Sequence, residues 1–394
     1  MTTRTPRRIA FVTPRYGPHI LGGAESQMRY NAERLAQRGH HVEVFSTSVS
    51  NLLTWESEAA PRHEAIHGIP VHLYPVRYTN RVRFRELHRR MHDGDALTND
   101  EQLEWLHTGP HSAQLYADLR RRMNDFDLFV CAPNPFPLVH YAAAAVLPRT
   151  AIWPCLHDEL YAHLLPTRLL LRDAFCIFYN TQIERELAEN IVGAPHPRAH
   201  VIGSGVDEIA GDPLRFRTTF DIHSPFLLYA GRIEAGKNTP LLINFFEQYK
   251  AKTRNDLKLV LIGEGRCSST SPDVIHLGHQ SERTKRDCMA AAVALCQPSV
   301  HESLSYVVLE SWLAGVPVLV HSDCAVTRKH VVKSGGGFHF DSIEIFRATI
   351  AALLSSPALR TRMGASGRRY VRAEYDWSDV LDRLENAFDA FIGC

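Results

Sequence analysis

Short apolar runs alternate with longer amphipathic segments along the chain. The strand-like runs are nearly continuous in Val, Ile, Leu and Phe, and they lie at 8–13, 41–46, 127–132, 150–155 and 175–180, then at 226–230, 257–263, 293–297 and 317–322. Such runs are typical of parallel strands covered on both faces. Helices are predicted between them, for example at 24–38 before Gly39 and at 306–314 before Gly315. The alternation predicts doubly wound α/β domains.

A segment rich in Gly, Pro, Asp and Thr at 203–225 separates the two series of strands. The 394 residues are also more than one compact core usually accommodates. We therefore predict two Rossmann-like domains, 1–205 and 206–394, that face each other across a cleft. The final helix, at about 376–394, is expected to pack back on the N-terminal domain.

Composition narrows the class of protein. The formal net charge is +1, which gives no bulk attraction to nucleic acid. The eight cysteines form no CxxC pair, and several lie inside apolar runs, which favours reduced thiols over a disulfide framework. The N-terminus does not resemble a signal peptide, and the apolar stretches fall short of the ~20 residues that span a membrane. These features predict a cytoplasmic protein.

A glycine-containing turn follows the first strand. Gly22 and Gly23 supply backbone without side chains where the first long helix begins, and the N–H groups at a helix start favour an anion. Glu25 lies in the first turn of that helix, where it suits the dipole. The pattern is not GxGxxG, which weakens a dinucleotide interpretation. A flexible connector remains the alternative.

The stretch YAGRIEAGKN, 229–238, nearly spells a P-loop. Gly231, Gly236 and Lys237 fit the GxxxxGK pattern, but Asn238 stands where a hydroxyl would hold magnesium. An NTPase is therefore disfavoured. Arg232 and Lys237 remain as two cations that can meet a diphosphate at a strand end, unless they are simply solvated surface charges.

The stretch HESLSYVVLE, 301–310, contains two glutamates eight positions apart. We expect Glu302 in a loop after a buried strand, a helix from 304 or 305, and Glu310 about two turns into it. A carboxylate that accepts two vicinal hydroxyls suits ribose. The N–H groups at the helix start suit phosphate, and they belong to Ser303, Leu304, Ser305 and Tyr306. In the alternative, Glu302 only caps the helix and Glu310 is solvated.

With these motifs the chain resembles the glycosyltransferases of family 4, retaining enzymes of the GT-B fold. The resemblance extends over nearly the whole length, through GGAE (22–25), HD (157–158), GSGVD (203–207), GRIEAGKN (231–238), the glutamate pair and YDWSDVLDRLENAF near the C-terminus. GSGVD replaces the more usual PNGVD, and 77–112 is individual. The resemblance therefore does not extend to the identity of the substrates.

The resemblance implies a role for each matching residue. It implies that Glu310 binds the nucleotide ribose, that Glu302 and His157 lie beside the reacting sugar, and that Arg232 and Lys237 hold the diphosphate. We further expect Gly23, Gly231 and Gly263 at the donor, and Gly22, Gly23, Arg81 and Arg85 at the acceptor. From the residues alone, His157 is more often a structural histidine than a site residue.

The segment 77–92 concentrates arginines with two aromatic residues, and it belongs to a long insertion at 77–112. We expect this insertion to form a lid or an acceptor wall. Its charge could receive an acidic acceptor or touch an anionic membrane surface, and a solvated face is equally consistent with it. The leucines of 164–175 are expected to pack into the core.

Three short motifs suggest metal sites and are set aside. HEAIH, 63–67, matches the zinc protease signature, but Pro61 and Gly68 bracket it too closely for the helix that a zinc site needs. DFD (125–127) and DGD (93–95) are expected at the entry to a strand and in a turn. We therefore predict no metal ligands and no cofactor besides the donor.

The favoured function is transfer of a sugar from a nucleotide-diphosphate sugar to an acceptor hydroxyl, with retention and without metal. The alternatives are a nucleotide-sugar epimerase, an inverting GT-B transferase, and a non-catalytic nucleotide-sugar-binding protein. His279 and Gln280 are weak candidates for contact with the base. The base, the sugar and the acceptor are not defined by the sequence.

Overall fold

The computed structural model describes residues 5–20 and 22–392, without the side chains of the last two. The chain divides into two compact units. Unit 1 comprises the chain up to Ser204 together with the residues from Leu381 onward, and unit 2 comprises Gly205–Val380. Helix α15 (Trp377–Ile392) begins in unit 2 and continues in unit 1.

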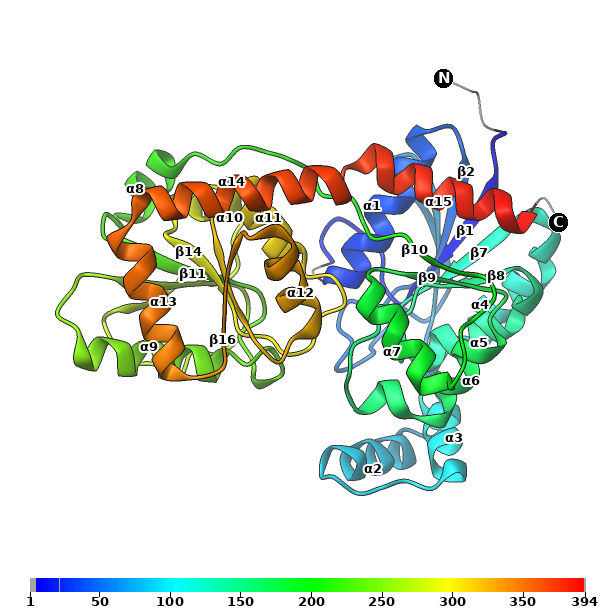
Figure 1. Ribbon diagram of the computed structural model, residues 1–394. Helices are drawn as coiled ribbons and strands as arrows, with labels where there is room; N and C mark the ends of the chain where they lie inside the picture. Colours follow the sequence, from blue (N-terminus) through cyan, green and yellow to red (C-terminus); the bar gives the residue numbers. More distant parts are fainter. Residues whose placement is uncertain (1–4, 21, 393–394) are drawn as a thin grey trace. The chain divides into compact units, whose positions relative to one another are not determined.

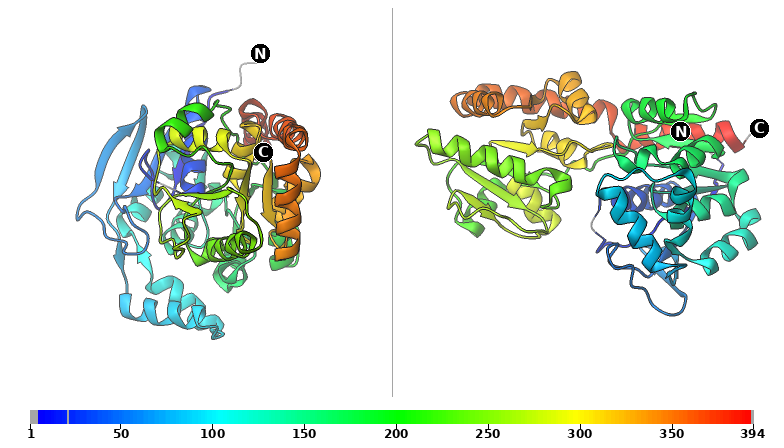
Figure 2. Two further views of the ribbon diagram at one scale, coloured as in Figure 1. Left: turned by 90° about the vertical axis from the view of Figure 1, so that its left-hand side faces the viewer. Right: turned by 90° about the horizontal axis from the view of Figure 1, so that it is seen from below.

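Unit 1 is built on a sheet of eight strands in the order β10-β9-β8-β7-β1-β2-β4-β3. The strands are β1 (Arg8–Val12), β2 (His41–Thr47), β3 (Arg62–Ile66), β4 (Ile69–Tyr74), β7 (Leu128–Cys131), β8 (Thr150–Ile152), β9 (Cys176–Tyr179) and β10 (Ala199–Val201). All neighbours are parallel except β3 and β4, which form an antiparallel hairpin at the edge, visible in the left view of Figure 2.

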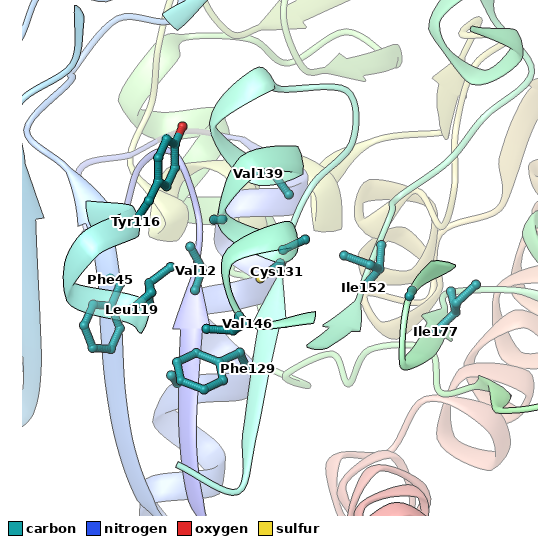
Figure 3. Close-up of a cluster of buried hydrophobic side chains, with 14 of the residues drawn as sticks. Val12, Phe45, Tyr116, Leu119, Phe129, Cys131, Val139, Val146, Ile152 and Ile177 are labelled. Atoms are coloured by element: carbon teal, nitrogen blue, oxygen red, sulfur yellow. The ribbon is translucent and has the colours of Figure 1, made fainter. Parts of the chain in front are cut away.

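Helices cover this sheet. They are α1 (Gly23–Gln37), α4 (Ala113–Arg121), α5 (Pro137–Ala145), α6 (Leu165–Asp173) and α7 (Gln182–Val192), with short 3₁₀ turns η1 (Met123–Asp125), η2 (Leu147–Arg149) and η3 (Leu160–His163). Figure 3 shows the core on one face, where Val12, Phe129 and Ile152 of the strands meet Leu119 of α4 and Val139 of α5. On the other face the ring of Phe178 lies 6.0 Å from that of Phe388 in α15.

Unit 2 has six parallel strands in the order β13-β12-β11-β14-β15-β16. They are β11 (Phe226–Ala230), β12 (Lys258–Ile262), β13 (Val274–His276), β14 (Ala294–Gln297), β15 (Val318–His321) and β16 (Gly337–Phe340). Counted within the unit, the order is 3-2-1-4-5-6, the doubly wound order of dinucleotide-binding domains. The chain adds strands outward from β11 on one side and from β14 on the other, so the strand order reverses between these two neighbours. Ligands are expected at the carboxyl ends of strands at such a point.

Both faces of the second sheet are also buried under helices (Figures 1 and 2). Its helices are α8 (Pro213–Phe220), α9 (Thr239–Lys252), α10 (Glu282–Ala291), α11 (Tyr306–Leu313), α12 (Ala325–Ser334), α13 (Ile343–Ser355) and α14 (Pro357–Glu374), with the 3₁₀ turn η4 (Ala235–Lys237). Along β11, Leu228 packs toward α10 and α11, whereas Leu227 packs toward α9 and α13. This explains why the strand sequence shows no polar alternation.

The predicted fold class is confirmed, with corrections in detail. The sequence interpretation missed the hairpin of β3 and β4 and the short strands β10, β13 and β16. Helix α11 begins at Tyr306 after the left-handed Ser305, with φ 67°, so Glu310 lies one turn into the helix and not two. As expected, HEAIH is not helical, because residues 62–66 form β3. Of the leucines of α6, Leu171 is fully buried in the core and Leu170 packs against it, which bears out the expectation for this segment in part.

The insertion at 77–112 consists of two helices. Between the short strands β5 (Arg77–Tyr78) and β6 (Pro110–His111) lie α2 (Arg81–His92) and α3 (Asn99–Thr108), which pack on each other through Leu87, Met91 and Trp105. Figure 1 shows α2 standing away from the sheet of unit 1. Arg83 donates two hydrogen bonds to Glu104, at 3.0 and 2.7 Å, so part of the arginine charge of this segment is paired internally.

The remaining global features concern thiols and membranes. The cysteines from Cys131 to Cys324 in the described chain are free, and those in β7, β9 and β14 are buried. Within residues 5–20 and 22–392, no helix is both long enough and apolar enough to cross a membrane.

Candidate functional site

The candidate site of unit 2 lies at the carboxyl ends of β11 and β14, where the strand order of its sheet reverses. Strands β11 and β14 are hydrogen-bonded neighbours, and each ends in one of the loops singled out from the sequence. The loop after β11 carries Arg232 and Lys237, and the loop after β14 carries Glu302. The fold therefore brings together three residues that are up to seventy positions apart in the sequence.

Glycines allow the loops after β11 and β12 to pack closely. Gly263 has φ 139°, and a Cβ on it would overlap the carbonyl oxygen of Gly231. The N–H of Gly231 donates to the carbonyl of Ile262 at 2.9 Å, and that of Ile233 donates to the carbonyl of Glu264 at 2.7 Å. A side chain at Gly263 would therefore displace the loop that carries the two cations.

Lys237 and Glu302 form the central contact of this site. The ammonium of Lys237 donates to Oε1 of Glu302 at 2.8 Å, and both side chains are half-buried. The amide of Asn238 donates to the carbonyl of Pro298 at 3.1 Å, which ties the two loops together. The sequence identified Lys237 and Glu302 separately, but it gave no indication that they touch.

Arg232 is placed differently from Lys237. Its guanidinium lies 3.1 Å from the carboxylate of Glu234, and its side chain is 66% exposed. Its main chain is fixed, because the hydroxyl of Tyr229 donates to the Arg232 carbonyl at 2.6 Å. Arg232 is thus anchored in the loop while its charged end remains accessible to solvent, and its role toward a diphosphate stays a prediction.

The start of α11 completes the loop after β14. Leu304 is buried in the core, so only its backbone could reach a ligand. Ser305 is also buried, and its hydroxyl lies 3.4 Å from the amide nitrogen of Gln297. The same amide lies 3.5 Å from Oε1 of Glu302. Gln297, at the end of β14, is therefore a site residue that the sequence interpretation missed.

Glu310 is held from a neighbouring helix. The ammonium of Lys285, in the first turns of α10, donates to Oε1 of Glu310 at 3.0 Å and lies 2.9 Å from Glu282. Burial acts to lower the pKa of Lys285, but Glu310 and Glu282 together raise it above its ordinary value, so the ammonium stays charged. The sequence interpretation missed Lys285.

In unit 1, the glycine turn after β1 begins α1 as predicted. Gly22 is the N-cap in extended conformation, and α1 starts at Gly23. Glu25 does more than face the helix dipole, because the guanidinium Nε of Arg15 donates to it at 3.2 Å. A Cβ on Gly22 would overlap the Glu25 carboxylate, whereas one on Gly23 would meet no atom within 4 Å among those described.

His157 follows β8 by five residues and lies in a loop with a buried anchor. Its Nδ1 is 3.3 Å from the carboxylate of Glu159. The neighbouring N–H of Leu156 donates to Oε1 of Glu184 at 2.6 Å, and the N–H of Asn180 donates to Oε2 at 2.5 Å. Burial raises the pKa of Glu184 to about 8, against the lowering effect of these amides. The sequence interpretation missed Glu184.

Arg81 and Arg85 lie on α2, which projects from unit 1. Arg81 stacks over Tyr78 at 5.3 Å and its guanidinium lies 3.4 Å from the carbonyl of Thr54. Arg85 is exposed. The structure places both on one short helix, and it leaves their proposed contact with an acceptor as a prediction.

The metal-like motifs have structural roles. Asp127 accepts a hydrogen bond from the N–H of Arg8 at 2.8 Å, and Asp93 accepts from Arg89 at 2.7 Å. His63 and His67 have separate partners, His72 and Glu33. In the described part of the chain, no group of three or more His, Cys, Asp or Glu side chains is arranged to hold a metal ion.

Comparison with known proteins gives the class. The family model for glycosyl transferases group 1 matches residues 212–370, and that for a glycosyl transferase 4-like domain matches residues 22–205. With the two doubly wound units, these matches define a glycosyltransferase of the GT-B fold. The chain belongs to the family 4 type of these enzymes.

Individual relatives agree with this assignment. The GDP-mannose-dependent monoacylated alpha-(1-6)-phosphatidylinositol monomannoside mannosyltransferase of Corynebacterium glutamicum is 27% identical over 48% of this chain and 56% of its own length, so the match spans little more than half of that relative. A D-inositol 3-phosphate glycosyltransferase of Segniliparus rotundus is 23% identical over 98% and 90%. Among solved structures, HepE of Anabaena in complex with UDP and glucose is similar in fold, with a TM-score of 0.70, 16% identity, and coverage of 98% and 100%.

Proposed function

We propose that this glycosyltransferase moves a sugar from a nucleotide-diphosphate sugar to an acceptor hydroxyl, with retention at the anomeric carbon and without a metal ion. The observation that carries the proposal is the convergence of Lys237, Glu302 and the start of α11 where the strand order of the second sheet reverses. The names of relatives support the donor class, because one depends on GDP-mannose and another was solved with UDP and glucose.

The diphosphate is assigned to the loop after β11. Its negative charge grows as the bond to the sugar breaks, and we assign Lys237 to stabilise that charge. To bind the diphosphate, Arg232 would have to break its exposed contact with Glu234, and breaking such a contact costs little free energy. The backbone of Ser303, Ser305 and Tyr306 at the start of α11 supplies further N–H groups. These groups would take the role that a metal ion has in other transferases.

The sugar is assigned to Glu302 and His157. The carboxylate of Glu302 is held by Lys237 through Oε1, so it can accept hydroxyls of the sugar with its other oxygen. His157 would contribute from unit 1, on a loop whose backbone is fixed by Glu184. Glu310, one turn into α11, is assigned to the ribose hydroxyls.

The chemical step is a same-face substitution. The bond from the anomeric carbon to the diphosphate oxygen breaks, and the bond to the acceptor oxygen forms on the same side. The acceptor proton passes to the departing phosphate oxygen, which becomes basic as the bond breaks. No carboxylate nucleophile is required, which agrees with Glu302 being engaged by an ammonium.

The acceptor is assigned to unit 1. At the start of α1, Gly22 faces the Glu25 carboxylate while Gly23 leaves its backbone uncovered, and Arg81 and Arg85 present cations on α2. This set suits a hydroxyl acceptor that carries an anionic group. The same arginines could bring unit 1 to an anionic membrane surface, as a second use of one charged face.

Product analysis tests the proposal. The purified chain is incubated with UDP-, GDP-, ADP- and TDP-sugars and candidate acceptors in EDTA, and the anomeric configuration of the product is determined by NMR. We expect transfer with retained configuration and an unchanged rate in EDTA. An inverted product, an epimerised donor, or a strict need for added magnesium would each contradict a specific part of the proposal.

A further inference from the structure

Lys285 is a buried cation that the family motifs do not include. It lies on α10, four residues after the N-cap Ser281, and its ammonium bridges Glu282 and Glu310 at 2.9 and 3.0 Å. Its side chain is 19% exposed and that of Glu310 22% exposed. The pair therefore lies at the edge of the site, where solvent screens it less than on an open surface.

The contact uses one oxygen of Glu310. Lys285 donates its hydrogen bond to Oε1, and in the part of the chain that the structure describes Oε2 accepts no hydrogen bond. A carboxylate with one oxygen fixed cannot rotate freely about its last bond. Its second oxygen then has a defined direction, which is what recognition of a vicinal pair of hydroxyls requires.

Helix α10 also connects Glu310 to the loop after β13. That loop runs through His279 and Gln280 to Ser281, whose hydroxyl accepts from the N–H of Thr284 and caps α10. The side chain of Gln280 donates to the carbonyl of Leu277 at 2.6 Å, so it is used within the loop. One helix thus connects the loop assigned to the base with the carboxylate assigned to the ribose.

We propose that Lys285 is a positioning residue for recognition of the donor ribose, acting through Glu310. This inference rests on the proposed function of the same site. On this proposal, the preference of the protein for nucleotides that carry both ribose hydroxyls depends on Lys285, which lies outside the glutamate motif. Lys285 would orient the carboxylate in the free protein, so that little order is lost when the nucleotide binds.

A purely stabilising ion pair would behave differently. Loss of such a pair would weaken the fold, or would weaken every nucleotide by the same factor. Loss of an oriented ribose acceptor would weaken only ligands that carry the ribose hydroxyls. The ratio of affinities for a nucleotide and its 2′,3′-dideoxy analogue therefore separates the two roles.

The test measures this ratio by calorimetry. UDP, GDP and ADP are each compared with their 2′,3′-dideoxy analogues on the wild-type chain and on Lys285→Met, Lys285→Arg and the control Lys252→Met. Lys252 is an exposed lysine at the end of α9 in the same unit. Thermal denaturation of each variant shows whether it is folded.

We expect Lys285→Met to lose about tenfold or more in affinity for the ribonucleotide, the usual size for a hydrogen bond to a charged group, and to leave the dideoxy analogue nearly unchanged. Lys285→Arg should retain part of the preference for the ribonucleotide over its dideoxy analogue. Lys252→Met should retain all of this preference. If Lys285→Met does not fold, the same ratio is measured on Lys285→Gln, with a smaller loss of the same sign expected.

Two results would overturn the inference in distinguishable ways. In the first, folded Lys285→Met keeps the wild-type ratio of affinities for the ribonucleotide and its dideoxy analogue, whether or not both affinities fall by the same factor. Lys285 then has no part in ribose recognition and the proposed function stands. If none of the three diphosphates binds the wild-type chain, the nucleotide site itself is wrong.

Discussion

Carboxylates stand near the carboxyl ends of the strands in both units, and their surroundings differ. In unit 1, Glu184 is 1% exposed and accepts two backbone N–H groups. In unit 2, the side chains of Glu302 and Glu310 are 12% and 22% exposed, and each contacts a lysine. The same residue type thus serves as a buried anchor in one unit and as a partly exposed partner of a lysine in the other.

The difference shows what a carboxylate needs in order to meet a ligand. An ammonium neighbour favours the charged form, and partial exposure leaves an oxygen within reach. Glu184 has neither, and burial raises its pKa to about 8. It accepts from the N–H of Leu156, next to His157, so we expect any effect of Glu184 on function to be indirect.

The largest effect is expected for Lys237→Ala. If Lys237 contacts the departing diphosphate as proposed, its removal should raise the barrier by about 3–4 kcal/mol and so lower kcat/KM more than a hundredfold. The side chains of Lys237 and Glu302 are 26% and 12% exposed, so loss of their contact should also lower the free energy of unfolding, by about 1.5–3 kcal/mol, which is less than the rise in the barrier. Steady-state kinetics and urea denaturation measure both, with Lys252→Ala as the matched control. Full activity would show that the phosphate assignment is wrong.

Glu184→Ala should have the opposite profile. Two buried N–H groups lose their acceptor, which should lower the free energy of unfolding by about 3 kcal/mol. The affinity of unit 2 for nucleoside diphosphate should not change, because Glu184 lies in unit 1. Denaturation and calorimetry on the same preparation test this. A variant that is fully stable would show that the buried carboxylate is not an anchor.

Glu310→Ala should weaken nucleotide binding by about 1.5–3 kcal/mol, the range for a hydrogen bond to a charged group. Stability should change less, although Lys285 loses one of its two carboxylate partners. Calorimetry with a nucleoside diphosphate is the measurement. Unchanged affinity would remove the ribose role from this residue.

The pH dependence of stability tests whether Glu184 is a buried acid. A carboxyl whose pKa rises from 4.5 to about 8 on folding keeps its proton in the folded state, so stability falls as pH rises between these values. The slope is at most about 1.4 kcal/mol per pH unit. In Glu184→Gln this slope should disappear, so the stability of the variant relative to that of the wild type should increase as pH rises. Parallel profiles from pH 5 to 8.5 would contradict the buried-acid assignment.

The smallest effect is expected for Arg85→Ala. Arg85 is exposed on α2, and such substitutions usually change stability by less than about 0.5 kcal/mol. The KM for an anionic acceptor should rise while that for the donor stays constant. A change in the KM for the donor alone would show that α2 affects binding of the donor and not of the acceptor.

The sequence predicted those parts of the fold that depend on strong local patterns. The central strands were visible because both faces are buried, so their apolar runs are continuous. The hairpin of β3 and β4 was missed because β3 is almost wholly exposed and carries polar residues. The short strands β10 and β13 are only partly buried, and they gave too weak a signal.

The site was predictable where residues form a spaced motif. Glu302, Glu310 and Lys237 were proposed in this way, and their roles toward a ligand stay predictions. Lys285 and Gln297 were missed because their roles come only from tertiary contacts, on a helix and at a strand end with no special spacing. Glu184 had one local signal: it lies three positions after Thr181, whose hydroxyl accepts from the N–H of Glu184, as in a capping box.

The most direct test compares a nucleoside diphosphate with its monophosphate. Calorimetry in EDTA should show that the wild-type chain binds the diphosphate more tightly, and that Lys237→Ala loses most of this preference while it keeps its affinity for the monophosphate. If the variant retains the full preference, or if the preference exists only with added magnesium, the second phosphate is held elsewhere and the account fails.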